Sequence, residues 1–387
     1  MISAKLAPFG TTIFSEMTRL ANAHGAINLA QGFPDFDGPP AMIDAAARAL
    51  HDGHNQYTRS MGHPKLVEAI RRFIERTYGL AYDPETEIAV TSGCTEAIAT
   101  SLIGLLNPGE TVLLFEPFYD SYPASVAMAG ATARYVTLRH PDFALDESAL
   151  ARVWDASVRV VLVNNPHNPS GKVFTRAELE LVANFARRHD TIVVSDEVYE
   201  NLTYDGAPHN PIASLPDMRK RTLTLSSAGK TFSCTGWKVG WVTGPASLVA
   251  ATQAAHQFTT FCTPPAFQIA VAAALDAADA AFLATYRAEY TARRDFLLAA
   301  LQASGFCPIR PRGTYFILAD YSALSHDDDL TFARRLVTEI GVAAVPPSVF
   351  YAADKTEGRR LLRFAFCKRP ETLDAAAERL NKLRLTQ

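Results

Sequence analysis

Paired cysteines, a strong charge of one sign and a long hydrophobic run are all missing from this chain of 387 residues. The formal net charge is only −3, so nothing favours nucleic acid or an anionic membrane as a partner. The cysteines are scattered without a CxxC pair, which argues against both a disulfide framework and a structural zinc site. They are Cys94, Cys234, Cys262, Cys307 and Cys367.

Targeting and metal signals are also weak. Lys5 is followed by Pro8 and Gly10 instead of an apolar segment, so no signal peptide is predicted. The most apolar stretch, residues 270–281, contains aspartates and is too short to cross a bilayer. His51 and His54 lack further ligand residues nearby, so no metal site is predicted. We therefore expect a cytoplasmic protein without a metal.

Apolar runs typical of strands alternate with helical patterns through the middle of the chain. A capping box, Thr175 with Glu178, marks the start of one helix. Strands that are apolar throughout and alternate with helices indicate a parallel sheet covered on both faces. The predicted strands are residues 88–91, 111–115, 158–163, 191–195 and 222–225.

The pattern changes near residue 285. Beyond it we expect helices at 285–304, 330–340 and 370–383, with strands at 314–320 and 361–366. Before the sheet we expect helices at 11–24, 40–50 and 64–78. The chain thus reads as an N-terminal arm (1–36), a large α/β domain (37–285) and a smaller α+β domain (286–387), which the arm joins.

Lys230 stands just beyond the apolar run 222–225, with Ser227 three residues before it and Lys238 eight residues after it. A lysine in a desolvated pocket has a lowered pKa and can attack a carbonyl. Taken alone, a lysine in a polar loop is more often solvated. The other segments decide between these readings.

Groups of complementary chemistry follow several predicted strands. In open α/β sheets, ligands bind beyond the carboxyl ends of the strands. A single ligand at that edge would need a phosphate, a flat ring, a partner for an anion, a phenol-type partner and a carbonyl for the lysine, and pyridoxal phosphate has all of these. The groups are Gly93, Cys94 and Thr95 at a helix N-terminus, Tyr119, Asn168, Asp196 and Tyr199.

Each group then has a role that its chemistry suggests. Lys230 would bond to the cofactor carbonyl and then move the substrate's Cα proton, and Asp196 would keep the ring nitrogen protonated. Asn168 and Tyr199 would bind the ring's 3-hydroxyl oxygen, and Tyr119 would stack on the ring. The phosphate would be held by backbone groups of Cys94 and Thr95, with Gly93 before them, and by Ser227 and Lys238.

Taken singly, most of these residues have a structural alternative. An aspartate after a strand is often a helix cap, an Asn-Pro pair is usually a turn, and Tyr119 could be a core aromatic. His167 and His256 are more typical of hydrogen-bonded structural residues than of catalysts. The functional interpretation is favoured because all the groups occur in the right order on one sheet.

The combined motifs resemble the class I/II aminotransferases, which are pyridoxal-phosphate enzymes of fold type I. The segments that carry this resemblance are 165–171, 195–199 and 227–238. Segments 31–36 and 235–241 are similar to the kynurenine aminotransferase/glutamine transaminase K branch, and 10–14 and 341–346 look closest to its bacterial methionine aminotransferases. The resemblance implies a mostly parallel seven-stranded sheet and a homodimer. Lys238 stands where many relatives have arginine.

The resemblance also assigns substrate contacts. Arg363 would bind the α-carboxylate, with a backbone donor from Gly32; an internal salt bridge of Arg363 is the alternative. Tyr57 would cross the dimer interface to the neighbour's phosphate, and Phe261 would line the neighbour's substrate pocket. The wall around the substrate side chain would comprise Ile13, Phe14, Tyr57 and Phe261.

We therefore expect an aminotransferase that moves the amino group of an uncharged amino acid to a 2-oxo acid. Methionine-like and aromatic donors come first, with glutamine and kynurenine as further candidates. One alternative keeps the cofactor but changes the reaction to a β-lyase acting on cysteine S-conjugates or cystathionine. Another is a ligand-sensing domain of a regulator, which the lack of room for a DNA-binding module before residue 30 disfavours.

Overall fold

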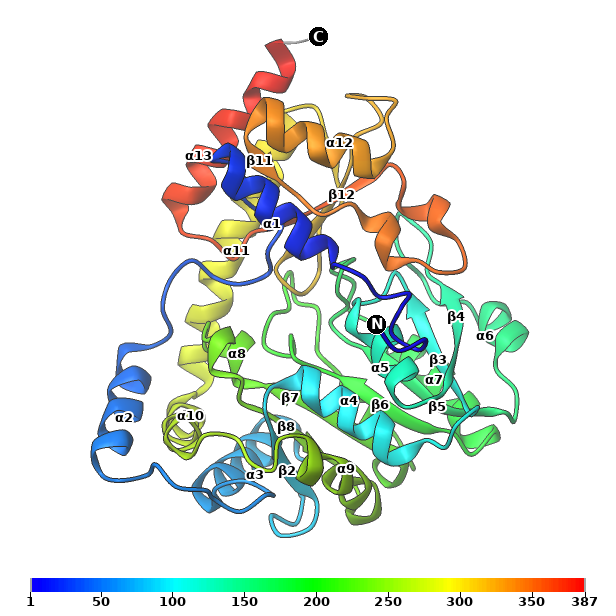
Figure 1. The fold of residues 1–387 in the computed structure, drawn as a ribbon, viewed down its shortest axis with the longest axis vertical. Coiled ribbons are helices and arrows are strands. Elements are labelled where there is room, and N and C mark those ends of the chain that lie inside the picture. The colour runs from blue at the N-terminus through cyan, green and yellow to red at the C-terminus, as the bar shows by residue number, and fades with distance from the viewer. Residues whose placement is uncertain (1, 386–387) are drawn as a thin grey trace.

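A seven-stranded sheet forms the centre of the protein in the computed structural model, which describes residues 2–385 (Figure 1). The strand order is β2-β8-β7-β6-β5-β3-β4, and every pair is parallel except those that β8 makes with β2 and β7. The mostly parallel seven-stranded sheet is thus confirmed. The strands are β2 (Ile88–Thr91), β3 (Thr111–Glu116), β4 (Thr132–Thr137), β5 (Val158–Asn164), β6 (Ile192–Asp196), β7 (Thr222–Ser227) and β8 (Gly240–Thr243).

The central strands are buried at nearly every position because they contribute to a core on each face of the sheet. Successive side chains of a strand point to opposite faces. Val160 and Leu162 therefore pack with α4 (Cys94–Leu105) and α5 (Ser121–Met128). Val161 and Val163 pack instead with α6 (Glu147–Val153) and α7 (Arg176–Arg188). Figure 1 shows α4 in front of the sheet.

Two strands of the seven-stranded sheet were not predicted from the sequence. β4 is an edge strand whose residues are mostly half-buried, so it lacks a continuous apolar run. β8 is only four residues long and begins at Gly240, which reads as part of a turn. A Cβ at Gly240 would lie 2.6 Å from the carbonyl carbon of Gly93. Glycine therefore allows β8 to pass close to the N-terminus of α4.

Four further helices and a short turn complete this part of the chain. A third apolar cluster joins Met42, Phe73 and Val271 with Val90 and Trp241 at the β2–β8 edge. The capping box at the start of α7 is present, since Thr175 Oγ1 accepts from the Glu178 N–H. The elements are α2 (Pro40–His51), α3 (Pro64–Tyr78), α8 (Ala228–Thr231), α9 (Ala246–Thr259) and α10 (Pro265–Ala277).

The C-terminal part is built around a three-stranded antiparallel sheet of order β12-β10-β9. Its long helix α11 begins at Ala280, before the expected start at residue 285, because the Asp279 side chain caps it. The expected helix at 330–340 is α12 followed by a π-helical turn, Leu336–Ile340. The elements are α11 (Ala280–Ala303), β9 (Cys307–Pro308), β10 (Phe316–Asp320), α12 (Asp329–Arg335), β11 (Val342–Ala343), β12 (Leu361–Ala365) and α13 (Pro370–Leu380).

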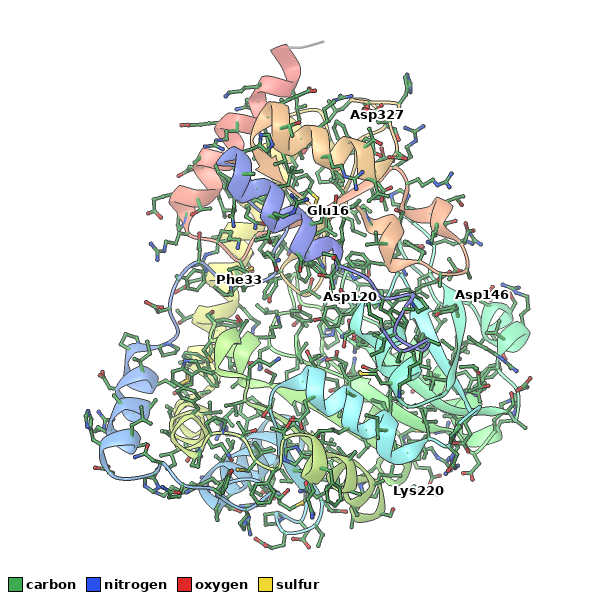
Figure 2. All side chains as sticks on the ribbon, in the orientation of Figure 1. Glu16, Phe33, Asp120, Asp146, Lys220 and Asp327 are labelled. Carbon is green, nitrogen blue, oxygen red and sulfur yellow. The ribbon has the colours of Figure 1, made fainter. Side chains whose placement is uncertain are left out.

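The N-terminal segment packs on the C-terminal part. Its elements are α1 (Ile13–His24) and β1 (Ile27–Asn28), and β1 pairs in parallel with β11. Glu16 on α1, labelled in Figure 2, forms an ion pair of 2.7 Å with Arg334 on α12. The division of the chain at residues 36 and 285 stays a prediction, and α11 crosses the second boundary.

No single helix of residues 2–385 is both long and apolar enough to cross a membrane. Only α10 and α11 taken together pass that test, by length and composition, and a bend of 97° separates them.

Candidate active site

One cavity of about 250 Å³ gathers most of the residues that the sequence singles out. It opens where β5, β6 and β7 end and where α4 begins, which is the edge at which open α/β sheets bind ligands. The predicted residues that line it are Phe14, Gly32, Gly93, Cys94, Thr95, Tyr119, Asn168, Asp196, Tyr199, Ser227, Lys230, Lys238 and Arg363.

Three predicted residues do not line the cavity within this chain. Ile13 is partly buried and packs instead against the apolar cluster that contains Val160 and Leu162. Tyr57 is 84% exposed and Phe261 is 41% exposed, and their rings meet edge to face at 5.3 Å. A role for Tyr57 and Phe261 in a neighbouring subunit stays a prediction, and so does a role for Ile13 in the substrate wall.

Lys230 is held in the cavity by the one-turn helix α8. The Ser227 hydroxyl caps this turn by accepting from the Gly229 N–H at 3.1 Å. Lys230 Nζ donates to the Tyr315 hydroxyl at 2.9 Å. Burial lowers the pKa of Lys230 to about 8. About one amine in ten is therefore neutral at pH 7, far more than for an ordinary lysine, and able to attack a carbonyl.

Asp196, at the end of β6, is buried and held by three donors. The Tyr122 hydroxyl donates to Oδ2 at 2.7 Å, and the Val198 N–H donates to Oδ1 at 3.3 Å. The Cys94 thiol is 3.6 Å from Oδ1. Burial raises the pKa of Asp196, and these donors oppose that shift. The arrangement fixes a carboxylate where a positively charged ring nitrogen would need a partner.

Lys238 lies beside the N-terminus of α4. Gly93 has φ +81°, and a Cβ there would lie 3.1 Å from Lys238 Nζ. Glycine thus allows the ammonium group to approach the free N–H groups of the helix. Those N–H groups and the helix dipole favour a phosphate. The lysine supplies the positive charge that a phosphate would pair with.

Arg363, on β12, is a buried cation that forms no ion pair with a side chain of residues 2–385. Its Nη1 donates to Asn168 Oδ1 at 2.9 Å and its Nη2 to the Ala30 carbonyl at 3.0 Å. Its Nε has no partner, and no carboxylate of residues 2–385 forms an ion pair with it. Burial lowers the pKa of Arg363 to about 10. The internal salt bridge considered as an alternative is absent from this part of the chain, and the guanidinium retains a free donor for an incoming anion.

Several residues of the site were not identified from the sequence. Tyr122 and Tyr315 touch Asp196 and Lys230 directly. Asn164, in the same motif as Asn168, donates to the Asp196 carbonyl at 3.0 Å. Its position at the end of β5 could have drawn attention to it. The remaining lining residues are Gln31, Phe33, Ile98, Val198, Gly229, Thr235 and Phe316.

The two histidines have structural partners away from the cavity lining. His167 Nδ1 lies 2.6 Å from the Ser170 hydroxyl, and burial lowers its pKa to about 3. His256 Nδ1 lies 2.7 Å from Glu96 Oε1. Neither residue lines the cavity.

The cavity's donor set fits pyridoxal phosphate. A partly neutral lysine meets the need for an amine, and a buried carboxylate meets the need for a partner of the ring nitrogen. The approach of Lys238 to Gly93 at the start of α4 places a cation where a phosphate would be held. These groups define a pyridoxal-phosphate-dependent enzyme of fold type I.

The family follows from comparison with known proteins. The model of the family "Aminotransferase class I and II" matches residues 24–380, and the chain belongs to this family. It is therefore an aminotransferase that uses pyridoxal phosphate, as predicted.

Its relatives act on different substrates. The chain is 40% identical to the methionine aminotransferase of Escherichia coli, covering 98% of each chain. It is 37% identical to the kynurenine–oxoglutarate transaminase of Dictyostelium discoideum, covering 99% of this chain and 96% of the other. The predicted resemblance to both groups is confirmed. A solved structure of N-succinyldiaminopimelate aminotransferase from Mycobacterium tuberculosis superimposes with a TM-score of 0.96 at 47% identity, covering 99% of this chain and all of the other.

Proposed function

We propose that the enzyme takes the amino group from an uncharged amino acid, methionine-like or aromatic, and passes it to a 2-oxo acid. The observation that carries this proposal is the count of cations that line the cavity. Among residues 2–385 these are Lys230, Lys238 and Arg363. Lys230 is assigned to the carbonyl of the cofactor and Lys238 to its phosphate. One arginine is then left for the substrate, and it is sufficient for an α-carboxylate only.

The surroundings of Arg363 support an apolar side chain next to it. The guanidinium lies 4.0 Å from the ring centre of Phe316 and 5.1 Å from that of Phe14. Phe33 lies on the cavity wall as well. Burying a thioether or phenyl group there contributes roughly 1.5–3 kcal/mol. A second carboxylate would be an unpaired buried charge at a cost of several kcal/mol.

Asp120, labelled in Figure 2, adds to the discrimination against acidic donors. Burial raises the pKa of its carboxyl, and the charge of Arg363 opposes that shift. A carboxylate close enough to interact with the charge of Arg363 also repels a second carboxylate of the substrate. We therefore expect methionine to exceed aspartate by at least ~100-fold in kcat/KM, since each 1.4 kcal/mol is about tenfold.

The chain's own residues divide the work of the reaction. Arg363 and the Gly32 N–H bind the α-carboxylate and thereby orient the Cα–H bond. Lys230 removes the Cα proton and returns it to a different carbon. Asp196 keeps the ring nitrogen protonated. When bound, the cofactor supplies an electron sink for the charge that develops at Cα.

We infer further that the functional unit is a homodimer in which each subunit completes the other's site. Tyr57 and Phe261 form an aromatic pair that is 84% and 41% exposed in its own subunit. Exposed aromatic groups of this kind are typical of interfaces. Tyr57 would reach the neighbour's phosphate, and Phe261 would line the neighbour's substrate pocket.

N-succinyldiaminopimelate is a second candidate substrate. It is favoured by the 47% identity, over 99% of this chain, to a protein with that activity in its name. Such a substrate carries carboxylates beyond the reacting end. The cations for them would have to come from outside the described cavity, for example from the second subunit.

A donor screen tests the proposal. The purified enzyme is given methionine, phenylalanine, histidine, glutamine, kynurenine, aspartate and N-succinyldiaminopimelate with a fixed 2-oxo acid, and kcat/KM is measured for each. Methionine or an aromatic donor should lead. Equal or better rates with aspartate would contradict the proposed substrate class. Release of pyruvate and ammonia from a cysteine S-conjugate without any 2-oxo acid would favour the β-lyase.

A further inference from the structure

The hydroxyl group of Tyr315 connects the lysine of the site to the loop expected to bind the substrate carboxylate. It donates to the Gly32 carbonyl at 2.5 Å and lies 2.9 Å from Lys230 Nζ. A carbonyl oxygen can only accept, so the phenolic hydrogen is committed to Gly32. The Tyr315 oxygen therefore accepts a hydrogen bond from Lys230.

The Tyr315 ring is fixed on several sides. It packs edge to face on Tyr199 at 5.2 Å and is stacked near Tyr290 at 6.2 Å, and no part of the side chain is exposed. The preceding residue, Thr314, has φ +64°, which is unusual for a β-branched residue. The Thr314 carbonyl accepts from the Tyr204 hydroxyl at 2.6 Å. This packing leaves the Tyr315 hydroxyl little freedom to move.

We propose that Tyr315 is a positioning residue, which orients the Lys230 amine whenever that amine is not bonded to the cofactor. The proposal rests on the assigned roles of Lys230 and Gly32. Lysine has a flexible four-carbon stem. An amine that must reach two different carbons in turn is less efficient if it samples many positions. Because the same hydroxyl binds Gly32, the carboxylate-binding loop and the amine are held in one geometry.

A role for Tyr315 as an acid or a base does not fit its surroundings. Burial raises its pKa well above the ordinary value of 10, so the phenol stays neutral at working pH. Its hydrogen also points away from Lys230, toward Gly32. Tyr315 thus acts through Lys230 and does not exchange protons with the substrate.

The variant Tyr315→Phe removes the hydroxyl and keeps the ring. Tyr290→Phe is the matched control, because it removes a hydroxyl from the neighbouring ring whose partner is Ser233 at 3.3 Å. In the full chain stripped of cofactor, acetic anhydride labels Lys230 only when its amine is neutral, and peptide mass spectrometry gives the pH midpoint. The titratable groups that surround Lys230 and stay unchanged are Cys94, Asp196, Tyr199, Lys238 and Cys367.

Losing an acceptor disfavours the ammonium form of Lys230. The labelling midpoint should fall by about 0.5–1 pH unit in Tyr315→Phe and stay unchanged in Tyr290→Phe. With cofactor and methionine, kcat should fall roughly tenfold while KM changes less than about threefold. The labelling result does not depend on any donor, so it stands or falls separately from the proposed substrate class.

Three outcomes would overturn the proposal. An unchanged midpoint would mean that Lys230 does not use the hydroxyl, and a raised midpoint would mean that Tyr315 donates to the amine. If Tyr315→Phe fails to fold while Tyr290→Phe folds, the hydroxyl is a structural support and not a positioning group.

Discussion

Substitution of Arg363 by glutamine distinguishes between a substrate-binding role and a structural role for this residue. The side chain is 1% exposed, makes two hydrogen bonds, and leaves Nε unpaired. Removing a buried cation without a counter-ion offsets the loss of those bonds. We therefore expect the free energy of unfolding of the cofactor-free chain to change by less than about 2 kcal/mol.

The effect on the reaction should be much larger. Truncating one partner of a buried, hydrogen-bonded charge pair costs about 2–5 kcal/mol, much of it for the charge left unpaired. Because each 1.36 kcal/mol is tenfold, kcat/KM for methionine should fall roughly 30- to 5,000-fold. The assay is steady-state amino transfer, paired with urea unfolding of the same preparations.

Arg294 provides the matched control. It is equally buried, at 1% exposed, but it is paired with Asp205 at 2.8 and 2.9 Å. Arg294→Gln should lose about 1.5–3 kcal/mol of stability and keep kcat/KM within about threefold. The reasoning is refuted if Arg363→Gln loses stability as Arg294→Gln does and keeps its kcat/KM.

Three other predictions address the remaining groups. Asp196→Asn should bind cofactor but lose at least ~100-fold in turnover, about 2.7 kcal/mol of barrier; near-normal turnover would make Asp196 structural. Burial alone would lower the pKa of His209, but Glu197, 2.8 Å away, outweighs it and raises that pKa above 6.5. The native protein should therefore be more stable than His209→Gln, with the whole difference in unfolding free energy present below pH 6.5. That difference should shrink as the pH rises through the folded-state pKa of His209. Unfolding of both proteins at several pH values measures it. Mixing inactive Lys230→Ala and Tyr57→Ala chains should restore activity in mixed dimers, and mixed dimers without activity would exclude Tyr57 from the shared site.

The sheet was largely predictable because its central strands bury both faces. Residues 111–115, 158–163 and 191–195 are rich in Val, Leu and Ile, as strands buried on both faces of a parallel sheet are. β8 was missed because four residues that start with glycine carry no periodic signal. The start of α11 was missed because an aspartate cap inside an alanine-rich stretch looks like an interruption of the helix.

Positions in the site were predictable where a residue directly follows a strand. Asp196 and Lys230 could be identified in this way, since the carboxyl ends of parallel strands share one edge. Tyr122 and Tyr315 could not, because their partners lie 74 and 85 residues away along the chain. Only the packing of distant segments brings those hydroxyls to the site. The roles assigned to individual residues remain predictions that mutagenesis can test.

Borohydride reduction of the cofactor-loaded protein tests the central claim most directly. Reduction fixes the cofactor to whichever amine holds it, and peptide mass spectrometry then identifies the residue. Lys230 lines the cavity, and burial lowers its pKa to about 8. The account predicts one labelled peptide, which contains Lys230. Label on another lysine, or none at all, would contradict it.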